Sequence, residues 1–212
     1  YLLEHHEKLR PWNPGTVEQR NLIELLRRRA VVQRHLSAID DSLQEVRELA
    51  RQKACLARYA NKVLAAIDAK IQALIASDAA LLKRQERLQT IVGIGPQISA
   101  VLAAVLSRYE FANVRAVIAY SGLDPRPNDS GGKRGRRVLS KRGPAGLRRM
   151  LWLAALSASH SKAFSAVYQS IKSRGFSGTQ ALVILARKML RVAWSVWRQE
   201  TPFDPAKVQM AA

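Results

Sequence analysis

"VVQRHLSAIDDSLQEV", residues 31–46, places apolar side chains at alternating steps of four and three residues. The apolar positions are Val32, Leu36, Ile39, Leu43 and Val46. This heptad spacing gives a helix one narrow apolar stripe, which needs a partner helix to cover it. Because no Gly or Pro interrupts residues 16–92, the stretch is predicted to lie within a long helical region.

A second apolar stripe follows along the chain. Its positions are Leu56, Ala60, Val63, Ile67, Ile71 and Leu74. Two helices joined near residues 49–55 would pack as an antiparallel hairpin, or would pair with the same region of another subunit. Thr16 and Gln19 have the spacing of a capping box, so the first helix is expected to begin there. Residues 16–84 are therefore predicted to form a coiled coil, with self-association as a hypothesis.

Most charged side chains of this region are expected to be solvated. Arg27, Arg28 and Arg29 are interpreted as a solvated helix face rather than a binding site. The same interpretation covers a set of acidic residues: Asp40, Asp41, Glu45, Glu48 and Asp68. Cys55, the only cysteine, is expected to be a small buried hydrophobe. One cysteine excludes an internal disulfide framework and a Cys-rich zinc site.

The stretch "LQTIVGIGPQISAVLAAVL", residues 88–106, has the pattern of a helix-hairpin-helix. Gly93 and Gly95 flank a tight turn, and Pro96 occupies the first turn of the following helix. Glycines allow a phosphate to approach the backbone closely, and the amide groups at a helix start attract an anion. DNA or RNA backbone binding is the prediction, and a tight helical turn without a ligand is the alternative.

The rest of the chain is expected to be helical as well. The apolar patterns predict helices at about residues 113–120, in the stretches after residues 143 and 162, and at residues 179–198. No segment shows the period-2 alternation of a strand. The fold class is therefore predicted to be all-α, a long coiled-coil hairpin followed by a compact helical domain at residues 85–200 and a tail at residues 201–212.

The charge balance indicates the kind of partner. The 212 residues include 35 Lys and Arg against 16 Asp and Glu, a net charge of +19. Such an excess favours a nucleic acid as partner, with an anionic membrane surface as the weaker alternative. No segment is long and apolar enough for a membrane span. The scattered His, Asp and Glu residues do not have the spacing of a metal site.

The most basic stretch is "NDSGGKRGRRVLSKRG", residues 128–143. Its chemistry is compatible with a basic linker, a phosphate-binding loop, or a loop that presents a serine to a nucleic-acid backbone. Cations around a serine hydroxyl would stabilise its alkoxide and the charge on an attacked phosphodiester. The candidate groups are the hydroxyls of Ser130 and Ser140 and the basic side chains of Lys133, Arg134, Arg136, Arg137, Lys141 and Arg142. From chemistry alone, phosphate binding is the prediction, and the choice between the two serines stays open.

Three motifs together resemble the C-terminal domain of a family of insertion-sequence transposases. They are "LQTIVGIGPQISAVLAAVL", "VRAVIAYSGLDPRPNDSGGKRGRRVLSKRGPAGLRRMLWLAA" and "QALVILARKMLRVAW". This family has a RuvC-like N-terminal domain with four acidic metal ligands, and it includes the Piv-type DNA invertases. The upstream stretch "LRPWNPG…LIELLRRRAVVQRHLSAI" is similar to the linker and coiled coil that join the two domains of that family.

The resemblance implies specific roles. Ser130 matches the serine that attacks DNA and forms a 5′-phosphoserine-type linkage, and Ser140 matches a backbone-contacting or structural position. The family uses a structured guide RNA and assembles as dimers or tetramers through the coiled coil. Residues 1–15 would be a remnant and linker after a RuvC-like domain that is missing here, so Mg²⁺ is expected only with that domain. The chain alone is therefore expected to be inactive. The resemblance also implies a location in the bacterial cytoplasm, near the nucleoid.

Two hypotheses of different classes follow. The first is the C-terminal half of a DNA transposase or site-specific recombinase with Ser130 as nucleophile. The second is a non-catalytic module for nucleic-acid binding and oligomerisation, in which Ser130→Ala would have no effect. A basic structural scaffold is a third interpretation, and the ordered series of motifs argues against it.

Overall fold

The computed structural model describes residues 13–127 and 138–206 of the chain, and these residues are mainly helical, with very little strand. In chain order the elements are α2 (Val17–Ser42), the 3-10 helix η2 (Arg47–Leu49), α3 (Ala50–Ala76), α4 (Ala79–Gln89), α5 (Pro96–Arg108), α6 (Val114–Ser121), β1 (Pro125–Arg126), β2 (Val138–Leu139), α7 (Ala145–Ala158), α8 (Ser165–Ser173) and α9 (Gly178–Gln199). The predicted all-α class is confirmed. The one addition is the short β1–β2 pair.

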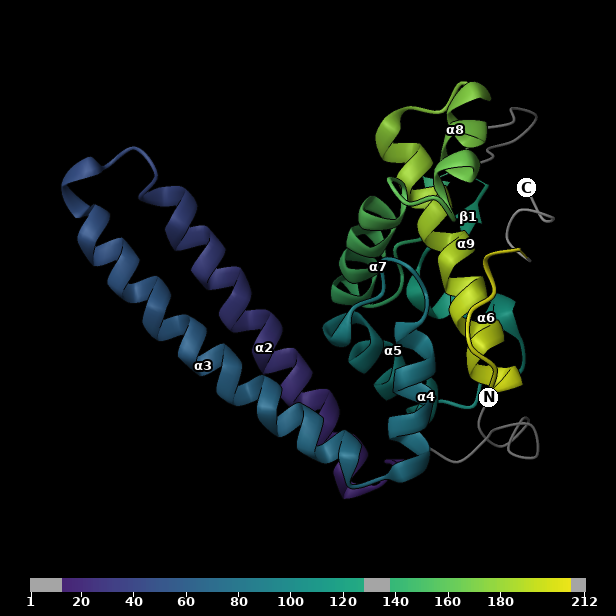
Figure 1. Ribbon diagram of the computed structural model, residues 1–212, viewed down its shortest axis with the longest axis horizontal. Coiled ribbons are helices and arrows are strands. Elements are labelled where there is room, and N and C mark those ends of the chain that lie inside the picture. The colour runs from purple at the N-terminus through teal and green to yellow at the C-terminus, as the bar shows by residue number, and fades with distance from the viewer. Residues whose placement is uncertain (1–12, 128–137, 207–212) are drawn as a thin grey trace, which may run out of the picture.

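Helices α2 and α3 form an antiparallel hairpin, here called the arm, that projects from the remaining helices (Figure 1). The predicted start of the arm is confirmed, because Thr16 and Gln19 cap α2 reciprocally. The predicted join at residues 49–55 is wrong, since α2 ends at Ser42 and the connection covers residues 43–49. Asp40, Asp41 and Ser42 are poor helix formers. The Ser42 hydroxyl also donates to the Ile39 carbonyl at 3.0 Å.

The arm is anchored at its base and loosely packed towards its tip. At the base, Leu22 of α2 and Ile71 and Ile75 of α3 are buried against Ala100 and Ala104 of α5. Further out, the described members of the predicted stripe are only partly buried, and several of them are exposed. The exposed members are Ile39 (37%), Val46 (38%), Leu56 (44%) and Val63 (39%). Pairing of α2 with α3 alone therefore does not cover the stripe.

An ion pair inside the arm corrects two predictions about solvated charges. Arg29 is buried, and its Nε and Nη2 donate to the Asp68 carboxylate at 2.5 and 3.0 Å. This bidentate contact joins α2 to α3 with the geometry that suits a guanidinium and a carboxylate. Arg28 is exposed as expected and pairs with Glu24 one turn away. Cys55, expected to be buried, is exposed.

The compact part of the chain, residues 79–206, is built around α9. One face of α9 is fully buried and packs against α7, with α6, α8 and α4 also in contact. Small residues allow this close approach, because Ala154, Ala155 and Ala158 of α7 are completely buried in the same core. Within α4, the buried Gln85 leaves its Oε1 without a partner, while its Nε2 donates to Ser99 Oγ at 3.3 Å.

Residues 200–204, here called the strap, run back over the compact part after α9. Glu200 adopts a left-handed conformation (φ 55°) and pairs with Arg84 at 2.7 Å and Arg87 at 3.2 Å. The amide of Phe203 donates to Thr90 Oγ1 at 2.8 Å, and its ring stacks on the buried ring of Phe164. The first residues of the predicted tail are thus packed on the core.

Candidate nucleic-acid interface

The predicted basic loop is described at its two ends. Ser130, Lys133, Arg134, Arg136 and Arg137 lie outside the described residues. On either side of them, β1 pairs antiparallel with β2, so that Pro125 lies opposite Leu139 and Arg126 opposite Val138. Residues 121–126 and 138–143, together with Arg148, form a compact unit that we call the clasp. The clasp brings together the motifs "YSGLDP" and "VLSKRG", which the sequence separates by the loop.

Ser140 and Asp124 are the polar centre of the clasp. The Ser140 hydroxyl donates to Asp124 Oδ1, and the Ser140 amide donates to the Asp124 carbonyl at 3.0 Å. Arg126 donates to Asp124 Oδ2 at 3.0 Å. Partial burial raises the pKa of Asp124, but the hydrogen bonds from Ser140 and Arg126 outweigh it, so the pKa lies below the ordinary aspartate value. The hydroxyl of Ser140 is therefore engaged in a structural contact with an ionised carboxylate.

The glycines of the clasp allow its two strands of chain to touch. Gly122 has a left-handed φ of 70°, and Lys141 has a φ of 53°. The amide of Lys141 donates to the carbonyl of Gly122 at 3.2 Å. A Cβ at Gly143 would collide with the backbone of Tyr120 and Ser121, so no larger residue fits there. Arg148, from the first turn of α7, donates to the carbonyls of Gly143 at 2.5 Å and Ser121 at 3.3 Å.

Two cations of the clasp stay available for a ligand. Lys141 and Arg142 are exposed, and within the described part of the chain neither makes an ion pair. Both lie directly after Ser140, so the clasp holds their backbone at the base of the basic loop. This arrangement suits contacts to phosphate oxygens, which fix a protein on a nucleic acid without reading its sequence.

The glycines of the predicted helix-hairpin-helix have different environments. Gly93 has a φ of 91°, and a Cβ there would lie 2.5 Å from the carbonyl of Ala154 in α7. Packing against α7 is thus sufficient to explain Gly93. Gly95 caps α5 at its N-terminus, with Pro96 at the first helical position as predicted, and the space around it is open. An anion could approach the start of α5 at Gly95 without steric hindrance, and phosphate binding there remains a prediction.

The α4–α5 turn and the clasp are separate places on the molecule. Gly93 packs against Ala154 and Ala158 of α7, whereas the backbone segments of the clasp lie next to Ala145 at the other end of that helix. A helix rises 1.5 Å per residue, so the two places are roughly 14–20 Å apart along α7. Any ligand that contacts both is consequently extended, as a nucleic acid is.

Helix α9 adds cations that the sequence analysis did not single out. Arg187 and Arg191 lie one turn apart, and neither has an ion-pair partner among the described residues. Burial, together with the neighbouring charge of Arg191, lowers the pKa of Arg187. The spacing of basic residues in "ARKMLR", residues 186–191, is the signal that could have identified them.

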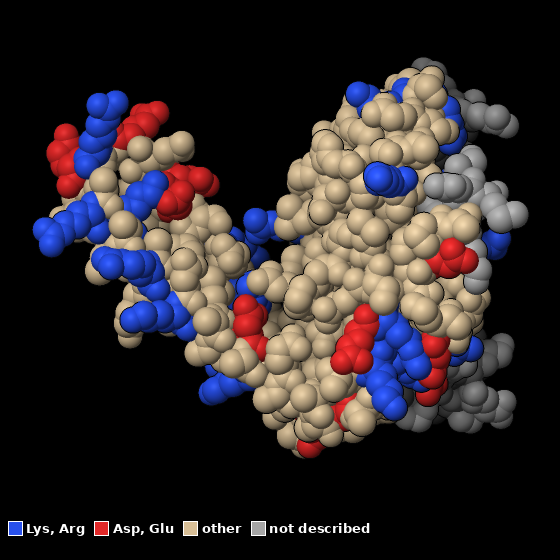
Figure 2. All heavy atoms as spheres, in the orientation of Figure 1, with Lys and Arg blue, Asp and Glu red and all other residues tan. Residues whose placement is uncertain are grey.

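Acidic side chains are few in the compact part, and those present are mostly engaged. The described ones are Glu86, Glu110, Asp124, Glu200 and Asp204. In the view of Figure 2, basic side chains spread along the arm, while the side of the compact part that faces the arm is largely uncharged. Over residues 13–127 and 138–206, no group of three or more His, Cys, Asp or Glu side chains gathers to hold a metal. Nor does a described helix have the length and hydropathy to cross a bilayer.

Comparison with protein families connects these features. Residues 85–169 match the transposase IS116/IS110/IS902 family. The match runs from within α4 into α8, and so contains the α4–α5 turn and both halves of the clasp. The arm and α9 lie outside the transposase-like segment.

Individual relatives extend the similarity. A probable family 20 transposase of Pseudomonas aeruginosa is 33% identical over 148 residues, which are 67% of this chain and 42% of that protein. The pilin gene-inverting protein of Moraxella bovis is 26% identical over 207 residues, 91% of this chain and 62% of the relative. The insertion element IS116 uncharacterized 44.8 kDa protein of Streptomyces clavuligerus is 33% identical over 127 residues. The chain spans 42%, 62% and 31% of the lengths of these three relatives.

Proposed function

We propose that this chain is the DNA-binding and strand-exchanging part of a transposase or site-specific recombinase. The observation that carries the proposal is the clasp, which lies inside the transposase-like segment and holds both ends of the most basic stretch of the chain. The names of the relatives, a transposase and a pilin gene-inverting protein, support DNA transposition or recombination as the process.

The charge distribution supports DNA as the partner. Lys141 and Arg142 in the clasp and Arg187 and Arg191 in α9 offer cations that no described carboxylate neutralises. Lys and Arg side chains that meet phosphates release the counterions condensed on DNA, which makes such binding favourable and sensitive to salt. A module that only bound nucleic acid would need the same cations, so charge alone does not assign catalysis.

We further propose that Ser130 is the nucleophile. Its oxygen would bond to a DNA phosphorus while the bond from phosphorus to the 3′ oxygen breaks, which leaves a 5′-phosphoserine and a free 3′ hydroxyl. The hydrogen bond from Ser140 to Asp124 supports this choice. The Ser140 hydroxyl would have to break that bond before it could attack DNA. The basic residues next to Ser130 in the sequence would stabilise the charge on the attacked phosphate.

A metal-dependent step would need carboxylates beyond those described here. The described Asp and Glu residues do not gather into a site for Mg²⁺, so no step is derived through a metal. We propose that Mg²⁺ belongs to a RuvC-like acidic domain that acts together with this chain, in the bacterial cytoplasm where the DNA lies. A structured guide RNA is proposed as a second nucleic-acid partner, which the exposed cations of the compact part would also bind.

We propose that the arm mediates self-association. Several large apolar side chains are exposed along the outer half of the arm: Leu49 (38%), Leu56 (44%), Tyr59 (70%) and Val63 (39%). An exposed apolar surface of this kind indicates a site of protein–protein contact. A second arm could cover these side chains by continuing the same heptad stripe. Light scattering would show a dimer or tetramer for the chain and a monomer for Leu56→Glu combined with Tyr59→Glu. An unchanged assembly in the double variant would contradict this role.

Covalent trapping tests the catalytic proposal. The chain, supplied together with the proposed RuvC-like acidic domain, is incubated with DNA that carries a nick next to the exchange site. Protein–DNA adducts are then separated under denaturing conditions. We expect an adduct with the unaltered protein, none with Ser130→Ala, and a reduced amount with Ser140→Ala because the clasp is weakened. An adduct that persists in Ser130→Ala would remove Ser130 as nucleophile. Equal DNA binding by both variants provides the control for folding.

A further inference from the structure

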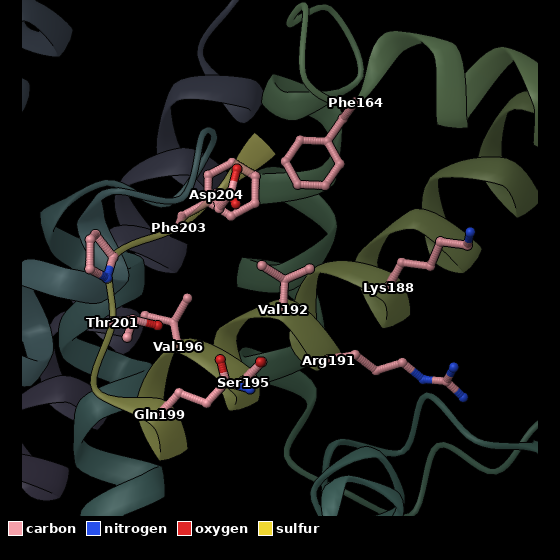
Figure 3. A pocket seen from close by; sticks show the side chains of 11 residues that line it. Phe164, Lys188, Arg191, Val192, Ser195, Val196, Gln199, Thr201, Phe203 and Asp204 are labelled. Carbon is pink, nitrogen blue, oxygen red and sulfur yellow. The ribbon is translucent and has the colours of Figure 1, made fainter. Parts of the chain in front are cut away.

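A slot of about 290 Å³ lies between α9 and the strap (Figure 3). Its apolar lining comes from Val192 and Val196 of α9 and from the ring of Phe203 in the strap, which stacks on the fully buried ring of Phe164. The two rings lie nearly parallel, with centroids 5.6 Å apart and an interplanar angle of 9°. The bond from the Phe203 amide to Thr90 and the ion pairs of Glu200 hold the strap in place, so the slot is a built part of the fold.

Uncharged polar side chains lie at one end of the slot. Ser195, Gln199 and Thr201 line it, and none of the three side chains makes a hydrogen bond with a described residue. Together, two hydroxyls and one amide offer both donors and acceptors. Polar groups of this kind beside an apolar wall fix the orientation of a small planar ligand.

The opposite end of the slot is basic. In Figure 3, Lys188 and Arg191 extend from α9 on the side away from Gln199 and Thr201. Arg191 is exposed and has no carboxylate partner among the described residues. The acid that lines the slot is Asp204, which accepts the amide of Ala206 at 3.0 Å. The slot therefore has an apolar middle with the Asp204 carboxylate beside Phe203, a neutral polar end and a cationic end.

We propose that this slot binds one unpaired nucleotide of a nucleic-acid strand. The base lies between Val192 of α9 and the ring of Phe203 in the strap, its edge faces Gln199 and Thr201, and its phosphate contacts Arg191. A base has a flat apolar face and carries hydrogen-bond donors and acceptors at its edge. These two features match the apolar middle and the neutral polar end of the slot. The inference rests on the proposed nucleic-acid binding and adds a site for a base that has left its helix.

The test compares two short DNA duplexes that differ at one position. One contains a single unpaired 2-aminopurine, a fluorescent base, and the other is fully paired with 2-aminopurine at the same place. Binding of the full chain is measured by fluorescence anisotropy. Stacking of one base on apolar and aromatic side chains contributes about 1–3 kcal/mol, which corresponds to at least about fivefold in affinity. We expect that preference for the unpaired duplex, together with a change in 2-aminopurine emission on binding.

Paired variants locate the preference on the molecule. Ser195→Phe fills the slot, and Ser157→Phe places the same ring on the exposed face of α7. We expect Ser195→Phe to abolish the preference for the unpaired base and Ser157→Phe to keep it. Arg191→Gln should weaken binding of the unpaired duplex more than that of the paired one, whereas Arg198→Gln, the same charge change outside the slot, should affect both duplexes equally. Circular dichroism checks that each variant is folded.

The outcomes separate this inference from the proposed function. Equal affinity of the unaltered chain for both duplexes would overturn the nucleotide site while leaving DNA binding intact. A preference that survives in folded Ser195→Phe would place the base elsewhere and would also overturn it. If Ser195→Phe does not fold, the comparison of Arg191→Gln with Arg198→Gln decides in the same way. Absence of binding to the paired duplex would instead contradict the proposed function itself.

Discussion

Single side chains in the clasp explain the pattern of its two motifs. Ser140 and Asp124 are 16 residues apart and share a hydrogen bond between side chains, while Gly122 and Gly143 let the two backbones touch. Each of these residue types is therefore required by packing or hydrogen bonding within the clasp.

Ser140 is predicted to stabilise the folded clasp. Ser140→Ala leaves Asp124 with one hydrogen-bond donor fewer, so the free energy of unfolding should fall by about 1–2 kcal/mol. Ser157→Ala, on the exposed face of α7, should leave it unchanged and serves as the control. Chemical denaturation of both variants measures the difference. Equal stabilities would show that the Ser140–Asp124 contact contributes nothing to the fold.

The contact between Asp124 and Ser140 should depend on pH. The pKa of Asp124 lies below its ordinary value, so the folded state favours the ionised carboxylate. Its contribution is fully present above the pKa of an unfolded aspartate, about 3.9, and is lost as the pH falls through the lower pKa of the folded state. The Tm difference between the unaltered chain and Asp124→Asn should therefore be constant near neutral pH and shrink below about pH 4. A difference that grows in acid would contradict the assigned ionisation.

Gly143 and Gly146 offer a matched test of close packing. A Cβ at Gly143 would collide with the backbone of α6, whereas a Cβ at Gly146 in α7 meets nothing within 4 Å. Gly143→Ala should lower the free energy of unfolding by more than about 2 kcal/mol. Gly146→Ala should be neutral or stabilise the chain by up to about 1 kcal/mol, because alanine favours a helix. Denaturation curves that rank the two variants in the opposite order would refute the close contact.

At the scale of elements, sequence patterns predict where helices begin better than where they end. Thr16 caps α2 and Asp78 caps α4, as their residue types indicate. The end of α2 was missed because no Gly or Pro marks it, and the apolar repeat continues through Val46 past the last helical residue. The burial of Arg29 was missed for a related reason. Its partner Asp68 lies 39 residues away, and only the pairing of the two helices brings them together.

The Arg29–Asp68 pair is predicted to hold the two helices of the arm together. Asp68→Ala leaves a buried guanidinium without its carboxylate, so the free energy of unfolding should fall by about 2–4 kcal/mol. Asp41→Ala removes an exposed carboxylate from the same hairpin and should have little effect. Thermal unfolding followed by circular dichroism distinguishes the two. A loss no greater for Asp68→Ala than for Asp41→Ala would mean that the pair contributes little to joining α2 and α3.

For the whole molecule, the sequence predicts an all-α chain with a long helical hairpin followed by a compact helical domain. The structure has this hairpin, and it projects from the compact part (Figure 1). Composition and motif order also indicate a nucleic-acid partner before any coordinates. The sequence could not predict which distant segments of the chain contact each other. The clasp joins residues on both sides of the basic loop, and the slot joins α9 to the strap. Each arises only when helices pack, because neither has a local sequence signal.

Because the whole molecule is strongly basic, its binding to DNA should depend on salt concentration, and this dependence can be measured. Each Lys or Arg that meets a phosphate releases a counterion, so the logarithm of the binding constant falls linearly with the logarithm of salt concentration. Neutralising Lys141 and Arg142 to Gln should reduce the slope by about 1 for each side chain. Arg28→Gln, which removes a cation already paired with Glu24, should leave the slope unchanged.

Salt titration of the binding of this chain to duplex DNA is the decisive experiment. We predict clear binding at low salt and a steep linear slope, on the order of five or more phosphates, reduced in the Lys141 and Arg142 variants. No binding at low salt, or an affinity that does not change with salt, would contradict the proposal that this basic helical chain is the DNA-binding part of a recombinase.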